Sequence, residues 1–546
     1  MSIVCDVIKK NFKEKADKRL YLFFDGYEVI ENVTYGEFGK RVMDFAGYLQ
    51  GIKTRGSRAL ILLPSSVDYL TAYFSCLFSN TVAVPLYEIN EEKQIENLKH
   101  IIENCDAEYI ITAERYVPQL NKWLGDMAEE LFICTIDNYV PRPYTEIEIN
   151  EDDIAYLQYT SGSTKSAKGV RITYGNIYAT CRIMRDRLKF CETDVFVTWL
   201  PLHFDMGLIG ANINPIVQGG TSCFSSADSF MKQPDSWFNA ASVYHGTVLI
   251  APNFAYEMCM KLPEETLEKF DFSSVRLTIN GSELVRNSTL SVLADKMKRY
   301  GLEPDSINPS YGLAENTLVV STHIPGKGYR YVTLDEAKLR ENIISYNDDG
   351  LDIVSCGKVC EGVGLSIIDI NDGTVLGEDE IGEVIVSGDS VADGYWLDED
   401  DSGFFESEDG EKCFATGDLG FMHDDHLYVV GRKKDMIIIR GKNIYSQDIE
   451  EFILNATEGK AATSVAFSVD NGEDEDLIII VETDENDESE MNNIINKVRT
   501  EVAANFGIVP SEVLIRKCGY LPRTDSGKVQ RQICKRQYIN SLCVVR

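Results

Sequence analysis

The stretch that decides the fold lies at residues 156–170 and reads YLQYTSGSTKSAKGV. It begins with an apolar and aromatic run, which is typical of the end of a strand. Hydroxyl residues, glycines and two lysines come next, and residues 177–188 then show a helical pattern behind a capping sequence. A polyphosphate needs backbone amides that can approach closely, hydroxyl donors and a neutralising cation. The stretch therefore predicts a phosphate-binding loop.

This loop differs from the Walker loop of many nucleotide triphosphatases, because neither Gly-Lys-Thr nor Gly-Lys-Ser occurs in it. The alternative interpretation is a flexible Ser/Gly linker. The apolar strand sequence on its N-terminal side argues against a linker. By itself, the loop names no reaction.

The composition limits the class of protein. At 546 residues the chain exceeds what one hydrophobic core usually supports, so we expect at least two domains. Its formal net charge of −34 argues against general nucleic-acid binding. No run of 18 apolar residues occurs and the first residues lack a secretory pattern, so we expect a cytoplasmic protein without an integral membrane segment. Scattered cysteines without a CxxC pair, and few histidines, argue against zinc and indicate buried free thiols.

Strand-like and helical segments alternate through the first part of the chain. Residues 58–64 and 81–86 are apolar strand candidates, and residues 67–78 between them show a helical pattern. The same rhythm continues at residues 109–112 and 131–137. Such alternation indicates βαβ units around a largely parallel sheet. We therefore predict an α/β fold.

Polar turns come directly after several predicted strands, where an open α/β sheet places its ligands. One turn contains Asn280 and Gly281, and another runs from Tyr311 to Glu315. Tyr311 is suited to stack on a purine, and Glu315 is suited to hold magnesium against a phosphate. Asp418 lies beside a glycine and is suited to accept two hydrogen bonds from ribose hydroxyls, although an aspartate there also suits a simple turn.

Two aromatic stretches, residues 195–210 and 251–256, place large apolar side chains beside turns. They are suited to wall a pocket for an apolar ligand, but for either stretch alone core packing is the better interpretation. Residues 321–352 are polar, with one helical stretch at 334–342, and are typical of an insertion.

The last quarter of the chain predicts a second, smaller unit. Residues 429–441 place charges between two apolar strands, which suits a hinge between domains. The remainder of the chain has the size of a small α+β domain, with a helical pattern at residues 488–506. Near its end, Lys528 lies beside Gly527, where it is suited to reach an anion.

Together these motifs resemble the adenylate-forming superfamily of acyl and aryl ligases, luciferases and nonribosomal adenylation domains. The markers are residues 160–169, 311–315, 416–418, 431–435 and 526–528, so the resemblance covers nearly the whole chain. It implies a large N-terminal domain, residues 1–431, with mostly parallel sheets and helices. It also implies a small, mobile α+β C-terminal domain, residues 432–546, that carries the catalytic lysine.

Within the superfamily, the chain resembles the fatty acyl-AMP ligases. The wording is similar at residues 157–164, 205–210, 251–256 and 313–318, and an insertion at about 322–352 is shared. In those ligases the insertion is associated with transfer of the activated acid to a carrier protein instead of coenzyme A.

The chain also departs from that subgroup. Phe204 stands where the subgroup usually has a histidine, and His203 is one position earlier, which leaves the role of the histidine open. Ser282 and Leu284 replace the more usual alanine and proline. Lys168 fits the wider superfamily better than it fits the subgroup.

The resemblance implies a two-step reaction. A fatty carboxylate attacks the α-phosphorus of ATP to give acyl-adenylate and pyrophosphate, and a phosphopantetheine thiol then takes the acyl group and releases AMP. Lys528, Glu315 and Thr160 would be catalytic, Glu315 and Thr160 would place Mg²⁺, and Lys434 would be the hinge. The other implied contacts are, for ATP or AMP, Thr160, Ser161, Gly162, Ser163, Thr164, Lys168, Asn280, Gly281, Ser282, Ser310, Tyr311, Gly312, Asp418 and Arg432, and, for the acyl pocket, His203, Phe204, Met206, Gly207, Phe254 and Tyr256.

The implied partners are a fatty acid, ATP with Mg²⁺, and a phosphopantetheine-bearing acyl carrier protein. Since no carrier domain comes after Lys528, the carrier is expected in trans. Basic residues near the C-terminus are suited to meet an acidic carrier. Three alternatives stay open: a fatty acyl-CoA synthetase, an amino-acid adenylation enzyme, and a nucleotide-binding scaffold that has lost catalysis.

Overall fold

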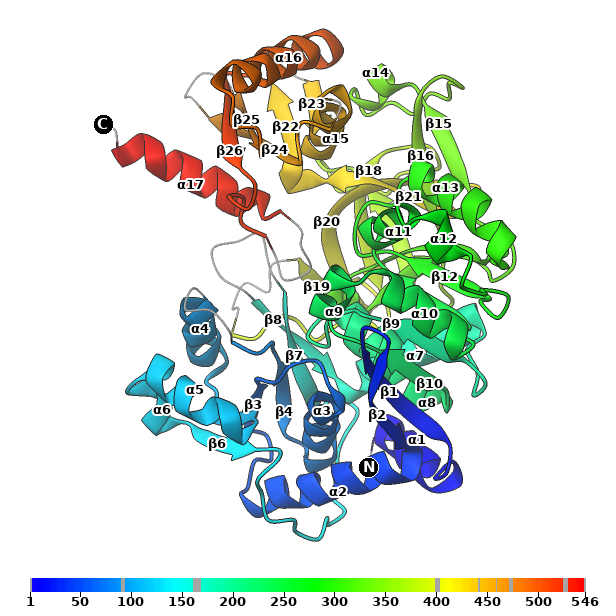
Figure 1. Cartoon of the computed structure of the whole chain (residues 1–546), viewed down its shortest axis with the longest axis vertical. Coiled ribbons are helices and arrows are strands. Elements are labelled where there is room, and N and C mark those ends of the chain that lie inside the picture. Colours follow the sequence, from blue (N-terminus) through cyan, green and yellow to red (C-terminus); the bar gives the residue numbers. More distant parts are fainter. Residues whose placement is uncertain are drawn as a thin grey trace.

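The computed structural model describes residues 2–89, 94–160, 168–397, 403–439, 442–457, 459–470, 475–523 and 529–544. Two large sheets with helices around them form the main body, and smaller strands and helices come after residue 435 (Figure 1). This arrangement confirms the predicted α/β class with a large N-terminal and a smaller C-terminal domain.

The strands predicted in residues 58–137 all form, and they belong to a six-stranded sheet. Pairing is parallel from β6 to β7, and β8 closes the sheet antiparallel to β7. In order across the sheet, the strands are β6 (Phe132–Thr135), β5 (Tyr109–Thr112), β3 (Arg58–Ile61), β4 (Val82–Pro85), β7 (Ile154–Thr160) and β8 (Lys168–Thr173), with helices α3 (Val67–Ser79), α4 (Ile95–Cys105), α5 (Val117–Leu124) and α6 (Met127–Glu130).

The second sheet is larger and changes character along its width. From β13 to β1 neighbouring strands are parallel, and from β13 to β17 they are antiparallel. In order, the strands are β17 (Gly364–Ile368), β18 (Gly382–Ser387), β20 (Lys412–His423), β21 (His426–Arg432), β16 (Leu351–Val359), β14 (Val319–Thr322), β13 (Ile307–Gly312), β12 (Leu277–Asn280), β11 (Val248–Ala251), β9 (Val195–Thr198), β10 (Thr221–Phe224), β1 (Arg19–Asp25) and β2 (Glu28–Thr34), while β15 (Tyr331–Leu334) pairs with β16 and β19 (Phe404–Glu406) with β20.

A capping box sets where helix α7 (Tyr174–Leu188) of the large domain begins. The helix predicted at residues 177–188 starts three residues earlier, because Thr173 and Asn176 form a capping box ahead of it. The helices are α1 (Ile3–Glu14), α2 (Tyr35–Gly51), α7 (Tyr174–Leu188), α8 (Asn214–Gln218), α9 (Ala227–Lys232), α10 (Asp235–Val243), α11 (Asn253–Met260), α12 (Glu264–Leu267), α13 (Asn287–Met297) and α14 (Glu336–Leu339), together with the π-helix η3 (Met206–Ile213) and the short turns η6 (Ala314–Asn316) and η7 (Lys433–Asp435).

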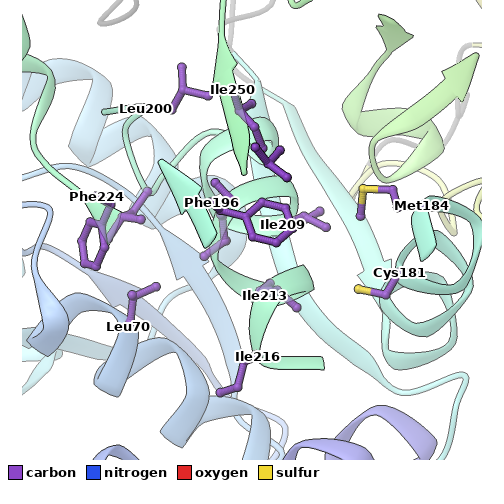
Figure 2. Packing of buried hydrophobic residues seen from close by; sticks show 14 of the residues in the cluster. Leu70, Cys181, Met184, Phe196, Leu200, Ile209, Ile213, Ile216, Phe224 and Ile250 are labelled. Atoms are coloured by element: carbon purple, nitrogen blue, oxygen red, sulfur yellow. The ribbon is translucent and has the colours of Figure 1, made fainter. Parts of the chain in front are cut away.

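One continuous apolar core joins the two large sheets. It includes Tyr156 of the first sheet and Phe196 of the second. Figure 2 shows Ile209 and Ile213 of η3 packed among Phe196, Met184 and neighbouring side chains. Because this core is shared, the carboxyl ends of strands from both sheets are held in a fixed relation to one another.

The segment predicted as an insertion is the connection between β14 and β16. It contains β15 and the four-residue helix α14, capped by Asp335. The helix predicted at residues 334–342 is therefore too long, since residues up to Leu334 pair antiparallel with β16 instead. Leu334 and Leu339 are buried and anchor the segment on Phe421 and Tyr428.

The small C-terminal part contains a three-stranded sheet covered on both faces. α15 and α16 lie on one face over a core that includes Ile449, Val481 and Val498, and α17 lies on the other near Phe467. The helix predicted at residues 488–506 is confirmed. The elements are β22 (Met436–Ile439), β23 (Lys442–Tyr445), α15 (Ser446–Ala456), β24 (Thr463–Asp470), β25 (Glu475–Thr483), α16 (Glu488–Phe506), β26 (Glu512–Lys517) and α17 (Arg531–Val544).

The cysteines placed by the structure are free thiols, and most are buried, as predicted. Burial raises the pKa of the Cys181 thiol to about 12, so this thiol stays protonated. Across the part of the chain that the structure describes, no helix combines the length and the apolar character needed to cross a bilayer. Among the same residues, no cluster of three His, Cys, Asp or Glu side chains is arranged to hold a metal ion.

Candidate active site

The predicted phosphate-binding loop joins two antiparallel strands. Thr160 ends β7 and pairs with Lys168, which begins β8. No strand is predicted from the sequence between this loop and α7, but Val170 and Ile172 are buried and belong to β8, which extends the sheet before α7 begins. The predicted phosphate contacts Ser161, Gly162, Ser163 and Thr164 lie outside the described residues, as does the predicted catalytic Lys528.

Two glycines let the chain pass closely at the carboxyl ends of β12 and β13. A Cβ on Gly281 would lie 2.8 Å from the carbonyl oxygen of Ser310, and a Cβ on Gly312 would lie 2.0 Å from that of Leu318. Ser282 adopts a positive φ of 72° in the same turn. Substitution of either glycine would push these backbones apart, so close approach explains both residues.

Asn280 ends β12 with its side chain fully buried. Its Nδ2 donates to Oδ1 of Asn253 at 3.2 Å, while its own Oδ1 has no hydrogen-bond partner among the residues that the structure describes. A buried acceptor without a donor is costly, and an amino group of a ligand would satisfy it. The predicted adenine contact therefore has a specific chemical basis.

The Asp418 carboxylate is held by a hydrogen bond on one oxygen and an ion pair on the other. Its Oδ2 accepts a hydrogen bond from Tyr311 Oη at 2.6 Å, and its Oδ1 lies 2.9 Å from Arg432 Nε. Asp418 and Arg432 face each other across β20 and β21. Burial raises the pKa of Tyr311 well above its ordinary value, and the charge of Asp418 raises that of Arg432, so both remain donors. Three predicted nucleotide residues are thus brought together and oriented.

Glu315 is held by a residue that the sequence motifs did not indicate. Tyr395 is almost fully buried, and its Oη donates to Glu315 Oε1 at 2.6 Å. Lys168 Nζ lies 4.8 Å from the centre of the same ring. The backbone beside Tyr395 joins β8, since the Trp396 amide donates to the Gly169 carbonyl. In the sequence, Tyr395 stands in a Gly-Tyr-Trp run, but no neighbouring residue indicates that it contacts Glu315 and Lys168.

Glu315 offers a hard oxygen ligand of the kind Mg²⁺ prefers. Its carboxylate is fixed by Tyr395, as outer-sphere partners commonly fix metal ligands. The residue therefore fits the predicted magnesium role. Its predicted companion, Thr160, is placed as the last residue of β7.

Aromatic side chains from the two stretches predicted to wall an acyl pocket pack together. The ring of Phe254 packs edge-on at 5.7 Å from Trp199, which in turn stacks on Phe230 at 4.2 Å. A Cβ on Gly207 would lie 2.2 Å from the Pro201 carbonyl, so only glycine lets the π-helix follow this turn. π-Helices are rare and often occur at functional sites. Met206 begins η3 and is partly buried against the core.

The remaining predicted acyl residues lie in two places. His203 packs on Phe204 at 4.5 Å and on Tyr87 at 5.2 Å, and Gln158 Nε2 donates to the His203 carbonyl at 2.7 Å. The loop that carries them is thereby fastened to β7. Tyr256 is fully buried and donates to the Ile279 carbonyl at 2.8 Å, so its hydroxyl braces the sheet.

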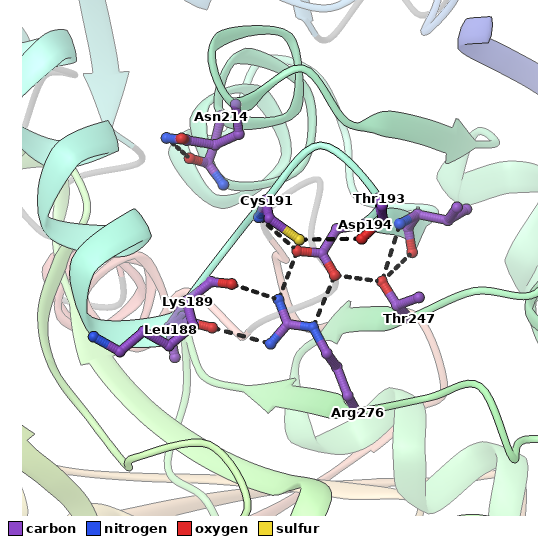
Figure 3. A network of polar contacts seen from close by, with 10 residues as sticks. Leu188, Lys189, Cys191, Thr193, Asp194, Asn214, Thr247 and Arg276 are labelled. Carbon is purple, nitrogen blue, oxygen red and sulfur yellow. Dashed lines mark hydrogen bonds and ion pairs between the residues drawn. The ribbon is translucent and has the colours of Figure 1, made fainter. Parts of the chain in front are cut away.

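At the opposite ends of the same parallel strands, a partly buried arginine pairs with a buried aspartate. Arg276, just before β12, forms a two-pronged contact with Asp194, just before β9, at 2.8 and 2.6 Å (Figure 3). Thr247, just before β11, donates to the same carboxylate at 2.8 Å. This network fixes the relative heights of three strands, and hence of the site residues at their other ends.

Lys434 lies in η7, directly after β21. Burial lowers the pKa of its ammonium group, and the neighbouring charge of Arg432 lowers it further. The predicted hinge residue therefore lies two positions from the arginine that holds Asp418.

Comparison with known proteins identifies the family. The profile of the family described as AMP-binding enzyme matches residues 8–396, and that of the Disco-interacting protein 2-like AMP domain matches residues 434–545. The medium-chain-fatty-acid–[acyl-carrier-protein] ligase JamA of Moorena producens is 30% identical, over 98% of this chain and 95% of its own. The long-chain-fatty-acid–AMP ligase FadD32 of Mycolicibacterium smegmatis is also 30% identical, over 97% and 93%.

Solved structures agree as well. A structure from work on the fatty acyl-adenylate ligases of E. coli and L. pneumophila superposes with a TM-score of 0.91 at 28% identity, covering 100% of this chain and 99% of that one. The L. pneumophila ligase in complex with acyl adenylate and pyrophosphate gives 0.76 at 28% identity, over 98% and 96%. The chain therefore belongs to the AMP-binding enzyme family, and over nearly its whole length it resembles the fatty acyl-AMP ligases.

Proposed function

We propose that this protein activates a fatty acid with ATP to an acyl-adenylate, releasing pyrophosphate. It then transfers the acyl group to the phosphopantetheine thiol of an acyl carrier protein supplied in trans. The observation that carries the proposal is the buried Asp418, oriented by Tyr311 and Arg432 beside the Glu315 turn. A carboxylate fixed in this way can accept hydrogen bonds from both ribose hydroxyls.

The nucleotide residues act by positioning. Asn280 would accept from the adenine amino group, and Asp418 would hold the ribose. Glu315 and Thr160 would hold Mg²⁺, which when bound neutralises phosphate charge. Lys528 would stabilise the charge that develops between the fatty carboxylate and the α-phosphate.

The proposed domain boundary lies at the end of β21, at residue 432, and Lys434 is the proposed hinge. Turning about this point would bring Lys528 to the nucleotide for the first step and remove it for the second. The proposed boundary lies between the family matches at residues 8–396 and 434–545, and the proposed hinge residue begins the second match, which supports this division.

A direct test offers the protein ATP, Mg²⁺ and a panel of fatty acids, with coenzyme A and a phosphopantetheinylated carrier protein in competition. Mass spectrometry should detect acyl-adenylate and then acyl-carrier protein. A product pool dominated by acyl-CoA would contradict the proposed acceptor. Failure to form acyl-adenylate from any fatty acid would contradict the activity itself.

The choice of carrier protein over coenzyme A is proposed to depend on the segment between β14 and β16. Arg340, at the end of α14, donates through Nη1 to the Asn505 carbonyl at 2.7 Å and lies 4.3 Å from the centre of the Phe506 ring. Both partners end α16, so the segment touches the small domain. Such a contact would resist the rotation that places the small domain for coenzyme A.

Arg340→Ala should therefore increase acyl-CoA formation while acyl-adenylate formation stays at the wild-type level. Deleting residues 326–350 would instead uncover Phe421 and Tyr428, so the point variant is the cleaner test. The matched control is Lys338→Ala on the same helix, whose partner is the exposed Glu341. Acyl-CoA production that stays at the wild-type level in the Arg340 variant would refute the restraint.

A further inference from the structure

We propose that Arg531 is a positioning residue that couples the segment carrying Lys528 to the hinge, through an ion pair with Asp435. The inference rests on the proposed function, in which Lys528 assists adenylation only. The contacts that support it are made by residues before 524 and after 528, which the structure describes.

The N-terminal side of that segment is anchored in the small domain. Arg523 Nη2 lies 3.0 Å from Glu482 Oε2 and 2.8 Å from Thr463 Oγ1, and the Leu521 amide donates to Glu482 Oε1 at 2.7 Å. The Glu482 side chain is 2% exposed, so the carboxylate that receives two of these contacts is buried. They tie residues 521–523 to the three-stranded sheet.

The two sides of the segment also meet each other. Arg523 and Val529 form an antiparallel bridge, and the Gln530 amide donates to the Pro522 carbonyl at 2.8 Å. Whatever fixes the residues just after Val529 therefore also fixes the base from which Lys528 extends. Arg531 begins α17 only three positions beyond that lysine.

Arg531 divides its guanidinium between two carboxylates. Nε and Nη2 contact the two oxygens of Glu450 at 3.0 and 2.8 Å, and Nη1 lies 2.8 Å from Asp435 Oδ2. The exposed fractions of the Arg531 and Asp435 side chains are 13% and 14%. Glu450 is further held by the Ala466 amide at 2.8 Å.

The two contacts have different consequences. Glu450 belongs to α15 of the small domain, so its fork-shaped contact with Arg531 fixes α17 within that domain. Asp435 ends η7, directly after Lys434 and three positions after Arg432, which holds Asp418. Glu450 already anchors Arg531, and burying a second carboxylate, that of Asp435, costs desolvation energy. The Asp435 contact is therefore better explained by a role in positioning than by a gain in stability. The Asp435 contact links the hinge to the base of the lysine segment.

Asp435→Asn tests the link, because it keeps the shape of the side chain and leaves the Arg531–Glu450 contact in place. Single-turnover formation of acyl-adenylate should slow by about 10- to 100-fold, since small displacements of a catalytic group have effects of this size. The KM values for ATP and fatty acid should change little. Transfer from chemically prepared acyl-adenylate to carrier protein should keep the wild-type rate, because Lys528 does not serve that step.

Two companion variants sharpen the result. Asp435→Glu restores a carboxylate and should recover much of the adenylation rate. Lys433→Gln removes the ion pair between the half-exposed Lys433 and Glu383 without touching Arg531, and should keep wild-type rates in both steps. Thermal unfolding should show that the Asp435→Asn protein remains folded.

Unchanged adenylation in Asp435→Asn would overturn the link, and so would equal losses in both half-reactions. If the wild-type protein forms no acyl-adenylate, the proposed function and the link fail together. An active wild-type protein with an unaffected Asp435→Asn variant overturns the link alone.

Discussion

Lys528→Ala is expected to lower fatty-acid-dependent pyrophosphate release by at least about 100- to 1,000-fold, which is the usual effect of removing a preorganised group from a developing charge. The lysine would meet the charge that grows between the carboxylate and the α-phosphate, so its loss affects the transition state most. ATP binding should persist, because Asp418 and Tyr311 belong to the large domain and Arg432, at the proposed boundary, keeps its contact with Asp418. Pyrophosphate release and calorimetric ATP binding, measured on the same preparation, separate these effects.

The matched control for this variant is Lys535→Ala, which removes another lysine from the same C-terminal region. It should keep the wild-type adenylation rate. Both proteins should unfold at the wild-type temperature. If Lys528→Ala adenylates fatty acid normally, the assignment of the catalytic lysine is wrong, and Lys168 beside Tyr395 becomes the cation to test.

Arg276→Met is expected to destabilise the large domain by about 3–5 kcal/mol, the usual cost of leaving a buried charge without its partner. The Asp194 carboxylate is 2% exposed and would keep only Thr247 and a backbone amide. Chemical unfolding followed by tryptophan fluorescence measures this change, since all the tryptophans lie in the large domain, at positions 123, 199, 237 and 396.

A matched substitution separates burial from charge. Arg299→Met removes the surface pair with Glu264, whose side chains are 57% and 48% exposed, and should cost no more than about 1 kcal/mol. Equal losses in the two variants would contradict the importance of the Asp194 network. If folded Arg276→Met loses adenylation activity, the relative positions of β9, β11 and β12 would be shown to control the placement of the site residues at their other ends.

The pH dependence of the same variant has a definite sign. Burial alone would raise the pKa of Asp194, but hydrogen bonds from Arg276 and the Cys191 amide, with the arginine charge, bring it below its ordinary value. Stability from this group is therefore present above the pKa of unfolded aspartate and is lost as the pH falls through the lower native pKa. In the wild type this contribution is lost below the ordinary aspartate pKa of 3.8, so the difference in unfolding free energy between the wild type and Arg276→Met should narrow as the pH falls below about 4.

Much of the fold could be predicted from local sequence. The apolar runs at residues 58–64 and 81–86 became β3 and β4 because short continuous apolar segments between turn signals suit a doubly covered strand. Strand β8, which is not predicted from the sequence, is the opposite case. Val170 and Ile172 extend the sheet only because β7 lies beside them, and no local pattern records that partner.

The candidate site also combines residues that local sequence indicates with residues that it does not. Tyr311, Asp418 and Arg432 could be chosen from their motifs, since each stands in a polar turn or hinge next to a strand. Tyr395 could not, because its hydrogen-bond partner Glu315 is 80 residues away.

The sequence by itself determined the kinds of chemistry available: the phosphate-binding loop, the acidic and aromatic residues at strand ends, and a lysine near the C-terminus. These features depend on residue type and short-range pattern. Only the tertiary structure decided which groups act together, such as Tyr395 with Glu315 and Arg531 with Asp435. The reason is physical: a hydrogen bond or a buried ion pair depends on distances of about 3 Å between atoms, and folding alone brings such distant residues that close.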